Sequence, residues 1–431
     1  MYYFIGIKGT GMASLAIMLK ELGYEVCGSD QEKHFFTEDE LIEKGIPIFP
    51  FDPENIKKEY TVIIGNAFLE DFPEVIRARS LCTCYRYHEF LGELMKNYTT
   101  VTISGSHGKT TTTTLTKTIL SRFKKTGYLI GDGEGFLEKD SEYLCVEADE
   151  FRRHFLSYYP QYALITNIEI DHVDYFKDEE DYFNAYQEFV GHVGKAVFYY
   201  GDDEWCKKLR FSCDAYSFGL NKGNDYYIDH LRSDTKRSSF DMYYHDDLIY
   251  HFDVPFVGDH LMIDVLSVLS FAHYMGFDLS KCQSALDEYV GPKRRYIVEE
   301  YKDTIFVDDY AHHPTEVKVT LQASRRRYPD RKIIAVFKPH RASRVLYFAK
   351  QFSQALQIAD EIYLLDFTSI DDKQDGTDID ISYLAQQIEG SIILPENDEG
   401  AQMLSKHKGE VLVFMSSKDI YNIAEKVKEL L

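Results

Sequence analysis

The sequence predicts an α/β protein of three domains, each built on a mostly parallel sheet. Short apolar runs alternate with longer amphipathic stretches from end to end, which is typical of repeated strand–helix units. The order of strand, turn and helix begins anew at Tyr2, at Thr99 and after Gly291. A chain of 431 residues also fits roughly two to four domains of ordinary size. We therefore expect domains at residues 1–98, 99–291 and 292–431.

The composition excludes several classes of protein. The chain has 48 Lys and Arg against 71 Asp and Glu, which gives a formal net charge of −23. A nucleic-acid-binding protein needs a basic face, so this balance argues against one. No apolar run approaches the length of a membrane span, which is about 18 residues. Seven scattered cysteines and no visible secretory signal predict reduced thiols and a cytoplasmic location.

The first domain is predicted from apolar runs that end in turns, with helical spacing between them. Its helices are expected at Met12–Leu22 and from about His88 to Met95. Its strands are expected at Tyr2–Ile7, Tyr24–Gly28, Val62–Phe68 and Leu81–Tyr87.

A glycine turn follows the first of these strands and reads G-I-K-G-T-G over residues 6–11. A dinucleotide fingerprint would place a third glycine at position 14, where Ser14 stands. Such a turn still lets backbone N–H groups and a helix N-terminus approach a pyrophosphate. Asp30 lies about 20 residues on, where an acid that binds a ribose is expected. Three interpretations stay open: a nicotinamide cofactor, the diphosphate of a nucleotide sugar, or a turn without a ligand.

The second domain repeats the pattern, with the strand Thr100–Ser104 and the helix Thr110–Leu120 on either side of a short turn. Residues 225–257 are rich in aromatic and charged residues and are expected to add antiparallel strands, followed by a helical stretch over 258–277. Further strands are expected at Tyr143–Ala148, Tyr162–Ile168 and Ala196–Tyr200.

The turn between that strand and helix is the most specific motif, a short phosphate loop that reads G-S-H-G-K-T. Backbone amides of such a loop surround triphosphate oxygens, Lys109 neutralises the β- and γ-phosphates, and the Thr110 hydroxyl binds Mg²⁺. The predicted ATP contacts in this segment are Gly105, Ser106, His107, Gly108, Lys109, Thr110 and Thr111.

Two polar positions follow neighbouring strands of the same domain. Glu147 ends the strand Tyr143–Ala148, where a phosphate-loop protein holds Mg²⁺ on a carboxylate. A solvated acidic loop is the alternative. His172 follows the strand Tyr162–Ile168 among acidic residues, so it is either a surface histidine or a ligand of a phosphate-bound metal.

The third domain begins after the sequence G-P-K-R-R at 291–295. Five apolar runs bounded by turn residues predict a further sheet, with helices between the strands. These strands are expected at Thr304–Val307, Lys332–Phe337, Glu361–Leu365, Ser391–Leu394 and Val411–Met415.

Taken in order, the motifs resemble those of the Mur ligase family over essentially the whole chain. They are G-I-K-G-T-G-M at 6–12, S-G-S-H-G-K-T-T at 104–111, E-A-D-E at 147–150, T-N-I-E-I-D-H-V-D at 166–174, G-P-K-R-R at 291–295 and D-D-Y-A-H-H-P at 308–314. Residues 65–68 and 151–156 resemble the version of the family found in Gram-positive bacteria. The resemblance implies an N-terminal Rossmann-like domain, a central ATPase-like domain with the phosphate loop, and a C-terminal Rossmann-like domain.

The resemblance also implies an activity: an ATP- and Mg²⁺-dependent ligase of peptidoglycan precursor synthesis. It would join L-alanine to the lactyl carboxylate of UDP-N-acetylmuramate through an acyl phosphate. Its partners would be these small molecules, with no nucleic acid, and the protein would be a monomer or homodimer.

Site residues follow from the same resemblance. Gly9, Thr10 and Gly11 would hold the UDP-sugar diphosphate, and Asp30 and Asn66 would line that pocket. Mg²⁺ would be bound by Thr110, Glu147 and His172. Asp309 would hold the ATP ribose and Arg295 would lie near the phosphates. His340 and Arg344 would face the amino acid and the acyl phosphate, which makes the expected catalytic residues Lys109, Glu147, His172, His340 and Arg344.

The chain departs from the family pattern at three places. Leu261 and Asp264 replace two asparagines near the adenine site, and Ser416–Lys418 lacks two glycines. Lys338, Arg341 and Lys418 add positive charge to the third domain, either for an acidic group or as solvated cations. These departures leave three alternatives open: a relative with a shifted acceptor, such as a tripeptide-recycling ligase; a catalytically weak nucleotide-binding paralogue; and a nicotinamide dehydrogenase, which fits poorly with Lys109 and Glu147.

Overall fold

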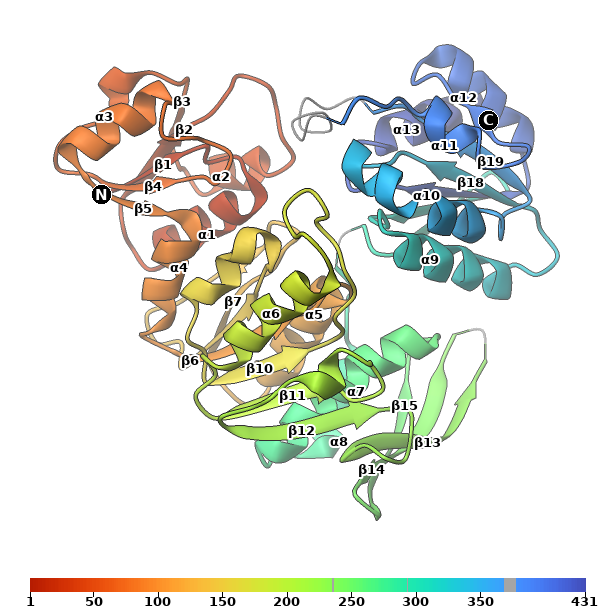
Figure 1. The fold of residues 1–431 in the computed structure, drawn as a ribbon, viewed down its shortest axis with the longest axis horizontal. Helices are drawn as coiled ribbons and strands as arrows, with labels where there is room; N and C mark the ends of the chain where they lie inside the picture. The colour runs from red at the N-terminus through yellow and green to blue at the C-terminus, as the bar shows by residue number, and fades with distance from the viewer. Residues whose placement is uncertain (235, 293, 368–376) are drawn as a thin grey trace. The chain divides into compact units, whose positions relative to one another are not determined.

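The protein is an α/β protein with three sheets (Figure 1), as the sequence predicted. The structure is a computed structural model that describes residues 1–234, 236–292, 294–367 and 377–431, so Lys293 of the G-P-K-R-R motif lies outside the described residues. Two compact units are formed: residues 1–169 with 180–290, and residues 170–179 with 291–431. The three domain boundaries stay a prediction.

The first sheet of the larger unit is parallel and has the strand order β3-β2-β1-β4-β5. Its centre is buried because β1 and β4 carry apolar side chains on both faces, as parallel strands covered by helices do. The strands are β1 (Tyr2–Ile5), β2 (Val26–Ser29), β3 (Ile48–Phe49), β4 (Thr61–Ile64) and β5 (Thr83–Arg86). The helices are α1 (Thr10–Glu21), α2 (Glu38–Glu43), the 3₁₀ turn η1 (Pro53–Asn55), α3 (Pro73–Leu81) and α4 (Tyr87–Met95).

The second sheet has ten strands in the order β15-β14-β13-β12-β11-β10-β6-β9-β7-β8. Antiparallel pairs join β13, β14 and β15 at one end and β7 to β8 at the other, and the remaining pairs are parallel. The strands are β6 (Thr99–Ser104), β7 (Thr126–Leu129), β8 (Gly135–Phe136), β9 (Tyr143–Glu147), β10 (Tyr162–Ile165), β11 (Ala196–Tyr200), β12 (Asp214–Gly219), β13 (Tyr226–Ser233), β14 (Ser238–Tyr244) and β15 (Asp247–Val254).

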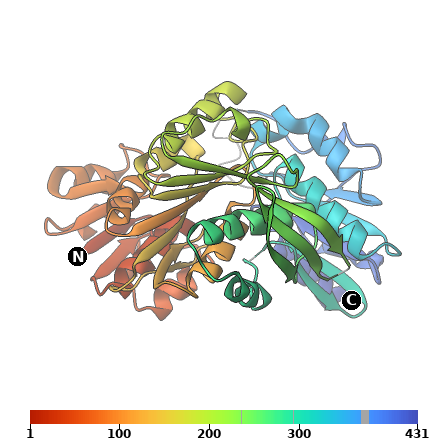
Figure 2. The ribbon, with the colours of Figure 1, turned by 90° about the horizontal axis from the view of Figure 1, so that it is seen from below.

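Helices cover this sheet on both faces, and Figure 2 shows α7 and α8 along one of them. An apolar core joins α5, α7 and α8 to the strands through residues such as Leu115, Leu164 and Leu266, all at most 1% exposed. Burial of this surface is the main stabilising contribution, at about 25 cal/mol per Å². The helices are α5 (Lys109–Leu120), the 3₁₀ turns η2 (Phe151–Ser157) and η3 (Cys206–Lys208), α6 (Glu179–Val190), α7 (Asp259–Tyr274) and α8 (Leu279–Asp287).

The smaller unit contains the third sheet, with strand order β16-β17-β21-β18-β19-β20. Only β16 is antiparallel to its neighbour, and β21 lies between β17 and β18. The carboxyl ends of β17, β18 and β21 therefore meet at one edge, which is where open α/β sheets bind ligands. The strands are β16 (Ile297–Tyr301), β17 (Thr304–Asp309), β18 (Ile333–Phe337), β19 (Glu361–Leu364), β20 (Ile392–Ile393) and β21 (Val411–Met415). The helices are α9 (Pro314–Arg327), α10 (Ala342–Leu356), α11 (Ser382–Ala385), α12 (Asp398–Leu404), the 3₁₀ turn η5 (Ser405–His407) and α13 (Tyr421–Leu430).

Among the described residues, the helices are too short or too polar to cross a lipid bilayer. The longest helix of the larger unit, α7, is apolar because it packs inside the protein, where ten of its residues are buried.

Candidate active site

The glycine turn of the first sheet connects β1 to α1, with Gly9 as the N-cap of α1 and Thr10 and Gly11 in its first turn. Asp30, at the end of β2, holds this turn in place. Its carboxylate accepts hydrogen bonds from the backbone N–H groups of Lys8 at 2.8 Å and Gln31 at 2.8 Å. Burial raises the pKa of Asp30, while these two N–H groups act in the opposite direction. Asp30 thus lies beside the predicted diphosphate turn and fixes its backbone.

Lys8 is a second organiser of this turn that the motif did not reveal. Its side chain is only 4% exposed. The ammonium donates to the carbonyl oxygens of Gln31 at 3.0 Å and Lys33 at 3.1 Å, and it lies 2.9 Å from a Glu38 carboxylate oxygen. The charge of Lys8 is therefore engaged in holding the segment between β2 and α2 against the turn.

Asn66, at the carboxyl end of β4, joins two histidines that sequence reasoning did not single out. Its amide lies 3.3 Å from Nδ1 of His154 and its amide oxygen 3.3 Å from Nδ1 of His88. The two imidazole rings stack with centroids 4.4 Å apart. Burial lowers the pKa of His88, which favours a neutral ring in this stack. The only sequence signal was the resemblance of residues 151–156 to a Gram-positive form of the family.

The phosphate loop lies between β6 and α5, and its two glycines are required by close contacts. Gly105 has φ +145°, and a Cβ there would lie 2.0 Å from Oγ1 of Thr166. Gly108 has φ +80°, and a Cβ there would lie 2.6 Å from Oδ1 of Asp264. Positive φ together with such contacts admits only glycine. Asp264, one of the departures from the family pattern, thus packs directly on the phosphate loop.

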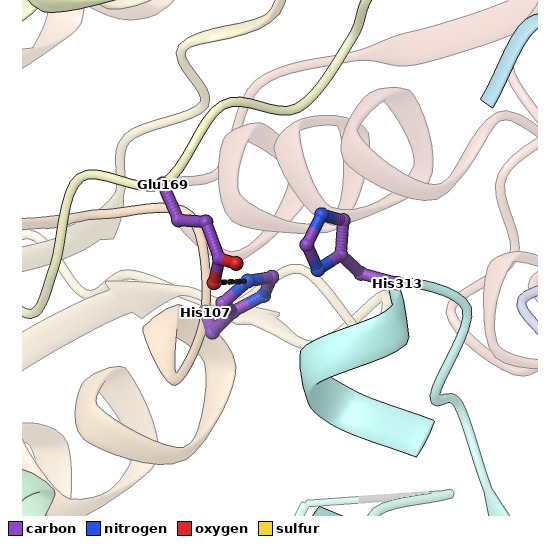
Figure 3. A group of neighbouring side chains, drawn as sticks. All are labelled: His107, Glu169 and His313. Carbon is purple, nitrogen blue, oxygen red and sulfur yellow. Dashed lines mark hydrogen bonds and ion pairs between the residues drawn. The ribbon is translucent and has the colours of Figure 1, made fainter. Parts of the chain in front are cut away.

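Residues between these glycines are tied to the segment that follows β10. The Ser106 hydroxyl donates to the carbonyl oxygen of Glu169 at 2.6 Å. The Nε2 atom of His107 lies 3.0 Å from a Glu169 carboxylate oxygen; the dashed line in Figure 3 marks this contact. The backbone N–H groups of Ser106 and His107 also donate to Asn167, to its carbonyl oxygen at 3.2 Å and to Oδ1 at 2.9 Å. Side chains and backbone of these two residues therefore hold the loop in shape.

Lys109 begins α5, and its ammonium is the only positively charged group in the loop. It donates to the carbonyl oxygens of Gly105 and Ser106 and lies 2.9 Å from the Glu150 carboxylate. Burial alone would lower the pKa of Lys109, but Glu150 and Asp149 outweigh it and raise the pKa. Lys109 is therefore a fixed positive charge at neutral pH.

Thr110 and Glu147 lie side by side at the ends of neighbouring elements. The Thr110 hydroxyl donates to Oε1 of Glu147 at 3.1 Å, and the N–H of Gly131 donates to Oε2 at 2.8 Å. Hydroxyl and carboxylate oxygens are hard ligands of the kind that Mg²⁺ prefers. This pair from α5 and β9 fits an oxygen site for the ion, and Thr111 follows in the first turn of α5.

In the smaller unit, His172 follows Asp171 within the segment 170–179. Its backbone has φ +52°, and its N–H donates to Oδ1 of Asp171 at 2.6 Å. The same oxygen accepts from Nε and Nη2 of Arg344, at 2.9 and 2.7 Å. Arg344 also donates to the carbonyl oxygen of His340 at 2.8 Å and is 3% exposed.

Two departures from the family pattern, Lys338 and Arg341, are neutralised inside this unit. Lys338 is 3% exposed, and its ammonium donates to both carboxylate oxygens of Glu396 at 2.9 and 2.8 Å. Arg341 is paired with Asp174. Neither residue is a solvated surface cation, because each charge is bound to a carboxylate of the same unit. The pairing of Lys338 also takes up the charge that an acidic acceptor would use.

Asp309, His340 and Arg295 lie at or near the carboxyl edge of the third sheet. Asp309 ends β17 and accepts from the N–H groups of Tyr296 at 2.8 Å and Ala311 at 2.7 Å. Burial raises the pKa of Asp309 to about 6, against the lowering effect of Arg295. Burial, with Lys418 and Arg344 nearby, holds the pKa of His340 far below its usual range, so that imidazole is neutral. Arg295 lies over the ring of Tyr310, 5.0 Å from its centroid. His313, labelled in Figure 3, is the N-cap of α9.

Comparisons with known proteins cover the whole chain. Three family models match in order: the Mur ligase family catalytic domain over residues 1–99, the Mur ligase middle domain over 103–272, and the Mur ligase glutamate ligase domain over 293–418. A UDP-N-acetylmuramate–L-alanine ligase of Lacticaseibacillus casei is 44% identical over 431 residues, which is 100% of this chain and 98% of the relative. The enzyme of the same name from Lactiplantibacillus plantarum is 40% identical over 430 residues, covering 99% of this chain and 98% of the relative.

Solved structures agree with this fold. A UDP-N-acetylmuramate-alanine ligase from Thermotoga maritima superimposes with a TM-score of 0.83 at 24% identity, covering 100% of this chain and 98% of the other. A murein peptide ligase from Psychrobacter arcticus gives a TM-score of 0.75 at 21% identity, covering 99% and 97%. At these identities the match concerns the fold alone.

Proposed function

The chain belongs to the Mur ligase family, and we propose that it is an ATP-dependent ligase that joins L-alanine to the lactyl carboxylate of UDP-N-acetylmuramate. One structural observation carries this proposal. A single compact unit contains both the glycine turn at Gly9–Gly11, suited to a diphosphate, and the phosphate loop at 105–110, suited to a triphosphate. A reaction between a nucleotide sugar and ATP needs these two sites in one protein.

The reaction has two steps. A carboxylate oxygen of the sugar nucleotide attacks the γ-phosphorus of ATP, forming an acyl phosphate while the bond to ADP breaks. The amine of L-alanine then attacks the acyl carbon, a proton leaves the nitrogen, and inorganic phosphate departs. The first step brings two anions together, so its barrier depends chiefly on positioning and charge neutralisation.

Lys109 supplies part of that neutralisation. Its ammonium is paired with Glu150 and donates to loop carbonyl oxygens, and we expect it to exchange part of these contacts for the γ-phosphate when ATP binds. The backbone N–H groups of the first turn of α5, which begins at Lys109, would meet the phosphate oxygens. Mg²⁺, when bound, supplies further positive charge, and we assign Thr110, Glu147 and His172 as the residues that hold it.

The smaller unit provides the remaining assignments, and each is a proposal from the family. Asp309 would hold the ATP ribose, with Arg295 near the phosphates. His340 and Arg344 would face the amino acid and the acyl phosphate. Because the pKa of His340 is held so low, its imidazole is a poor base and serves as a hydrogen-bond partner rather than as the acceptor of the alanine proton.

The proposed substrates also suggest a location within the cell. ATP and UDP-sugars are cytoplasmic metabolites of peptidoglycan precursor synthesis, so we propose a cytoplasmic enzyme.

Lys338 and Arg341, the cations that suggested an acidic acceptor, are paired with Glu396 and Asp174. L-Alanine is therefore the acceptor that we propose, in place of a larger acidic peptide.

The test is phosphate release from ATP with every combination of UDP-N-acetylmuramate and amino acid. We expect turnover only when the sugar nucleotide and L-alanine are both present. UDP-N-acetylglucosamine is the matched control, since it lacks the lactyl carboxylate and should not support turnover. Glycine, L-serine and a tripeptide acceptor test the amine preference. Steady ATP hydrolysis without the UDP-sugar would contradict a ligase.

A further inference from the structure

Tyr87 lies against the glycine turn although it belongs to a different element. It is the first residue of α4, directly after β5, while the turn precedes α1. A Cβ at Gly11 would lie 2.7 Å from the Tyr87 hydroxyl oxygen and 2.8 Å from the neighbouring ring carbon. The phenol therefore occupies the space that any side chain at position 11 would fill. Only glycine allows this approach, which gives a structural reason for Gly11 beyond the turn itself.

Acidic residues also lie near the Tyr87 hydroxyl, in addition to the glycine turn. Burial raises the pKa of Tyr87, and the carboxylates of Asp149 and Glu147 raise it further. Glu147 is the residue bound to Thr110 at the phosphate loop. The hydroxyl is therefore a protonated donor that lies between the glycine turn and the carboxylates beside the phosphate loop.

Three contacts hold the start of α4 in this position. The Arg86 N–H donates to the Glu89 carboxylate at 2.8 Å, which caps the helix. On the other side of Tyr87, Nδ1 of His88 lies 3.3 Å from the amide oxygen of Asn66, and the His88 ring stacks on His154. The backbone on either side of Tyr87 is thus fixed, and the direction of its ring follows from it.

The hydroxyl of Tyr87 makes no hydrogen bond with any residue in the ranges 1–234, 236–292, 294–367 and 377–431. A tyrosine this enclosed usually has a partner for its O–H group. Here the neighbouring groups on one side are the N-terminal turn of α1, whose N–H groups and dipole favour an anion.

We propose that Tyr87 donates its hydroxyl hydrogen to the diphosphate of the bound UDP-sugar and so contributes to the binding of that substrate. This rests on the proposed function, because it requires a nucleotide sugar in the glycine turn. The diphosphate is favoured over the lactyl carboxylate because the hydroxyl contacts Gly11 itself, the second residue of α1. A neutral donor at this place also separates the diphosphate from the carboxylates of Glu147 and Asp149.

The experiment compares Tyr87→Phe with the wild-type protein by calorimetric titration of UDP-N-acetylmuramate and of UDP, without ATP. Phenylalanine keeps the ring against Gly11 and removes only the donor. A lost hydrogen bond to a charged group predicts about tenfold weaker binding of both ligands. The KM for ATP and the melting temperature should not change. Tyr85→Phe is the matched control, since Tyr85 lies on β5 two residues away and packs edge-on against Phe90.

The outcomes separate this inference from the proposed function. If the wild-type protein does not bind UDP-N-acetylmuramate, the proposed function itself is wrong. If the wild-type protein binds it and Tyr87→Phe binds both ligands equally well, only the role of Tyr87 is overturned. A loss confined to UDP-N-acetylmuramate, with UDP unaffected, also overturns it, because the contact would then be with the muramoyl group.

Discussion

Arg344 and Asp171 form a buried ion pair in which Nε and Nη2 of the guanidinium donate to one carboxylate oxygen, at 2.9 and 2.7 Å. The pair connects α10 to the segment 170–179, which belongs to the same compact unit. That oxygen also accepts the N–H of His172. The ion pair therefore fixes the backbone at the predicted metal ligand, and Arg344 has a structural task in addition to any role toward the acyl phosphate.

Breaking this pair should destabilise the protein strongly. Asp171→Asn leaves the Arg344 charge buried without its counter-charge, and removal of one partner of a buried pair costs about 3–5 kcal/mol of unfolding free energy. Adding Arg344→Gln should recover part of that loss. Urea unfolding of the single and double variants measures both effects. Arg237→Gln is the control, because the pairs of Arg237 with Asp253 at 2.7 Å and Asp287 at 2.9 Å are exposed and should each contribute about 1 kcal/mol or less. Equal losses for Asp171→Asn and Arg237→Gln would contradict this account.

Lys109→Ala should abolish phosphoryl transfer and leave the UDP-sugar bound. The variant lacks the positive charge that neutralises the γ-phosphate, so kcat should fall about 100- to 1000-fold. Calorimetry should still detect UDP-N-acetylmuramate at wild-type affinity, since the glycine turn is untouched. Lys117→Ala is the control: it lies two turns along α5, paired with Glu134 at 3.2 Å, and should turn over normally. Near-normal rates for Lys109→Ala would remove the phosphate loop from the mechanism.

Asp309 should make the protein more stable as the pH falls toward 4. Its pKa is about 6 in the folded chain against 3.8 without the fold, so the ionised form is disfavoured by folding. That penalty is complete above pH 6 and disappears as the pH falls through 6 to 3.8. Two pKa units correspond to about 3 kcal/mol at most. The unfolding free energy of the wild type relative to Asp309→Asn should therefore rise by up to that amount between pH 8 and pH 4. Parallel pH profiles would contradict the raised pKa.

Much of the larger unit was predictable because close backbone approach dictates residue type. Positive φ at Gly105 and Gly108 is needed to bring amides toward a phosphate, so the loop appears in the sequence as glycines at fixed spacing. Parallel strands such as β1 and β4 were found because both of their faces are apolar. The strands β7 and β12, which also pair in parallel, were not predicted. The two-residue strand β3 escaped detection because so short a run carries no periodic signal.

Side-chain partners were not predictable in the same way. The stack of His88 on His154 joins residues far apart in the chain, and the helical spacing that begins near His88 does not specify a distant partner. The charges of Lys338 and Arg341 were visible in the sequence, but their partners were not. Glu396 and Asp174 are distant in the chain and meet these cations only through the tertiary fold of the smaller unit. The role of Tyr87 was likewise not predictable from the sequence, because it depends on a contact with Gly11, which lies in a different helix.

His172→Ala should slow acyl-phosphate formation far more than it weakens ATP binding. The strands β9 and β10 flank β6 in the sheet, so the segments that follow them leave the same edge as the phosphate loop. If His172 and Glu147 hold Mg²⁺, loss of the imidazole leaves the approach of the substrate carboxylate to the γ-phosphate opposed by like charge. ATP binding should change little, because Lys109 and Thr110 remain. We expect single-turnover ADP formation to slow on the order of 100-fold and to recover partly at high Mg²⁺, since a missing ligand weakens metal affinity. His192→Ala is the control, because its ring stacks on exposed Tyr159 and otherwise contacts the Tyr158 carbonyl oxygen at 3.3 Å. A rate for His172→Ala that is normal at every Mg²⁺ concentration would remove His172 from the site.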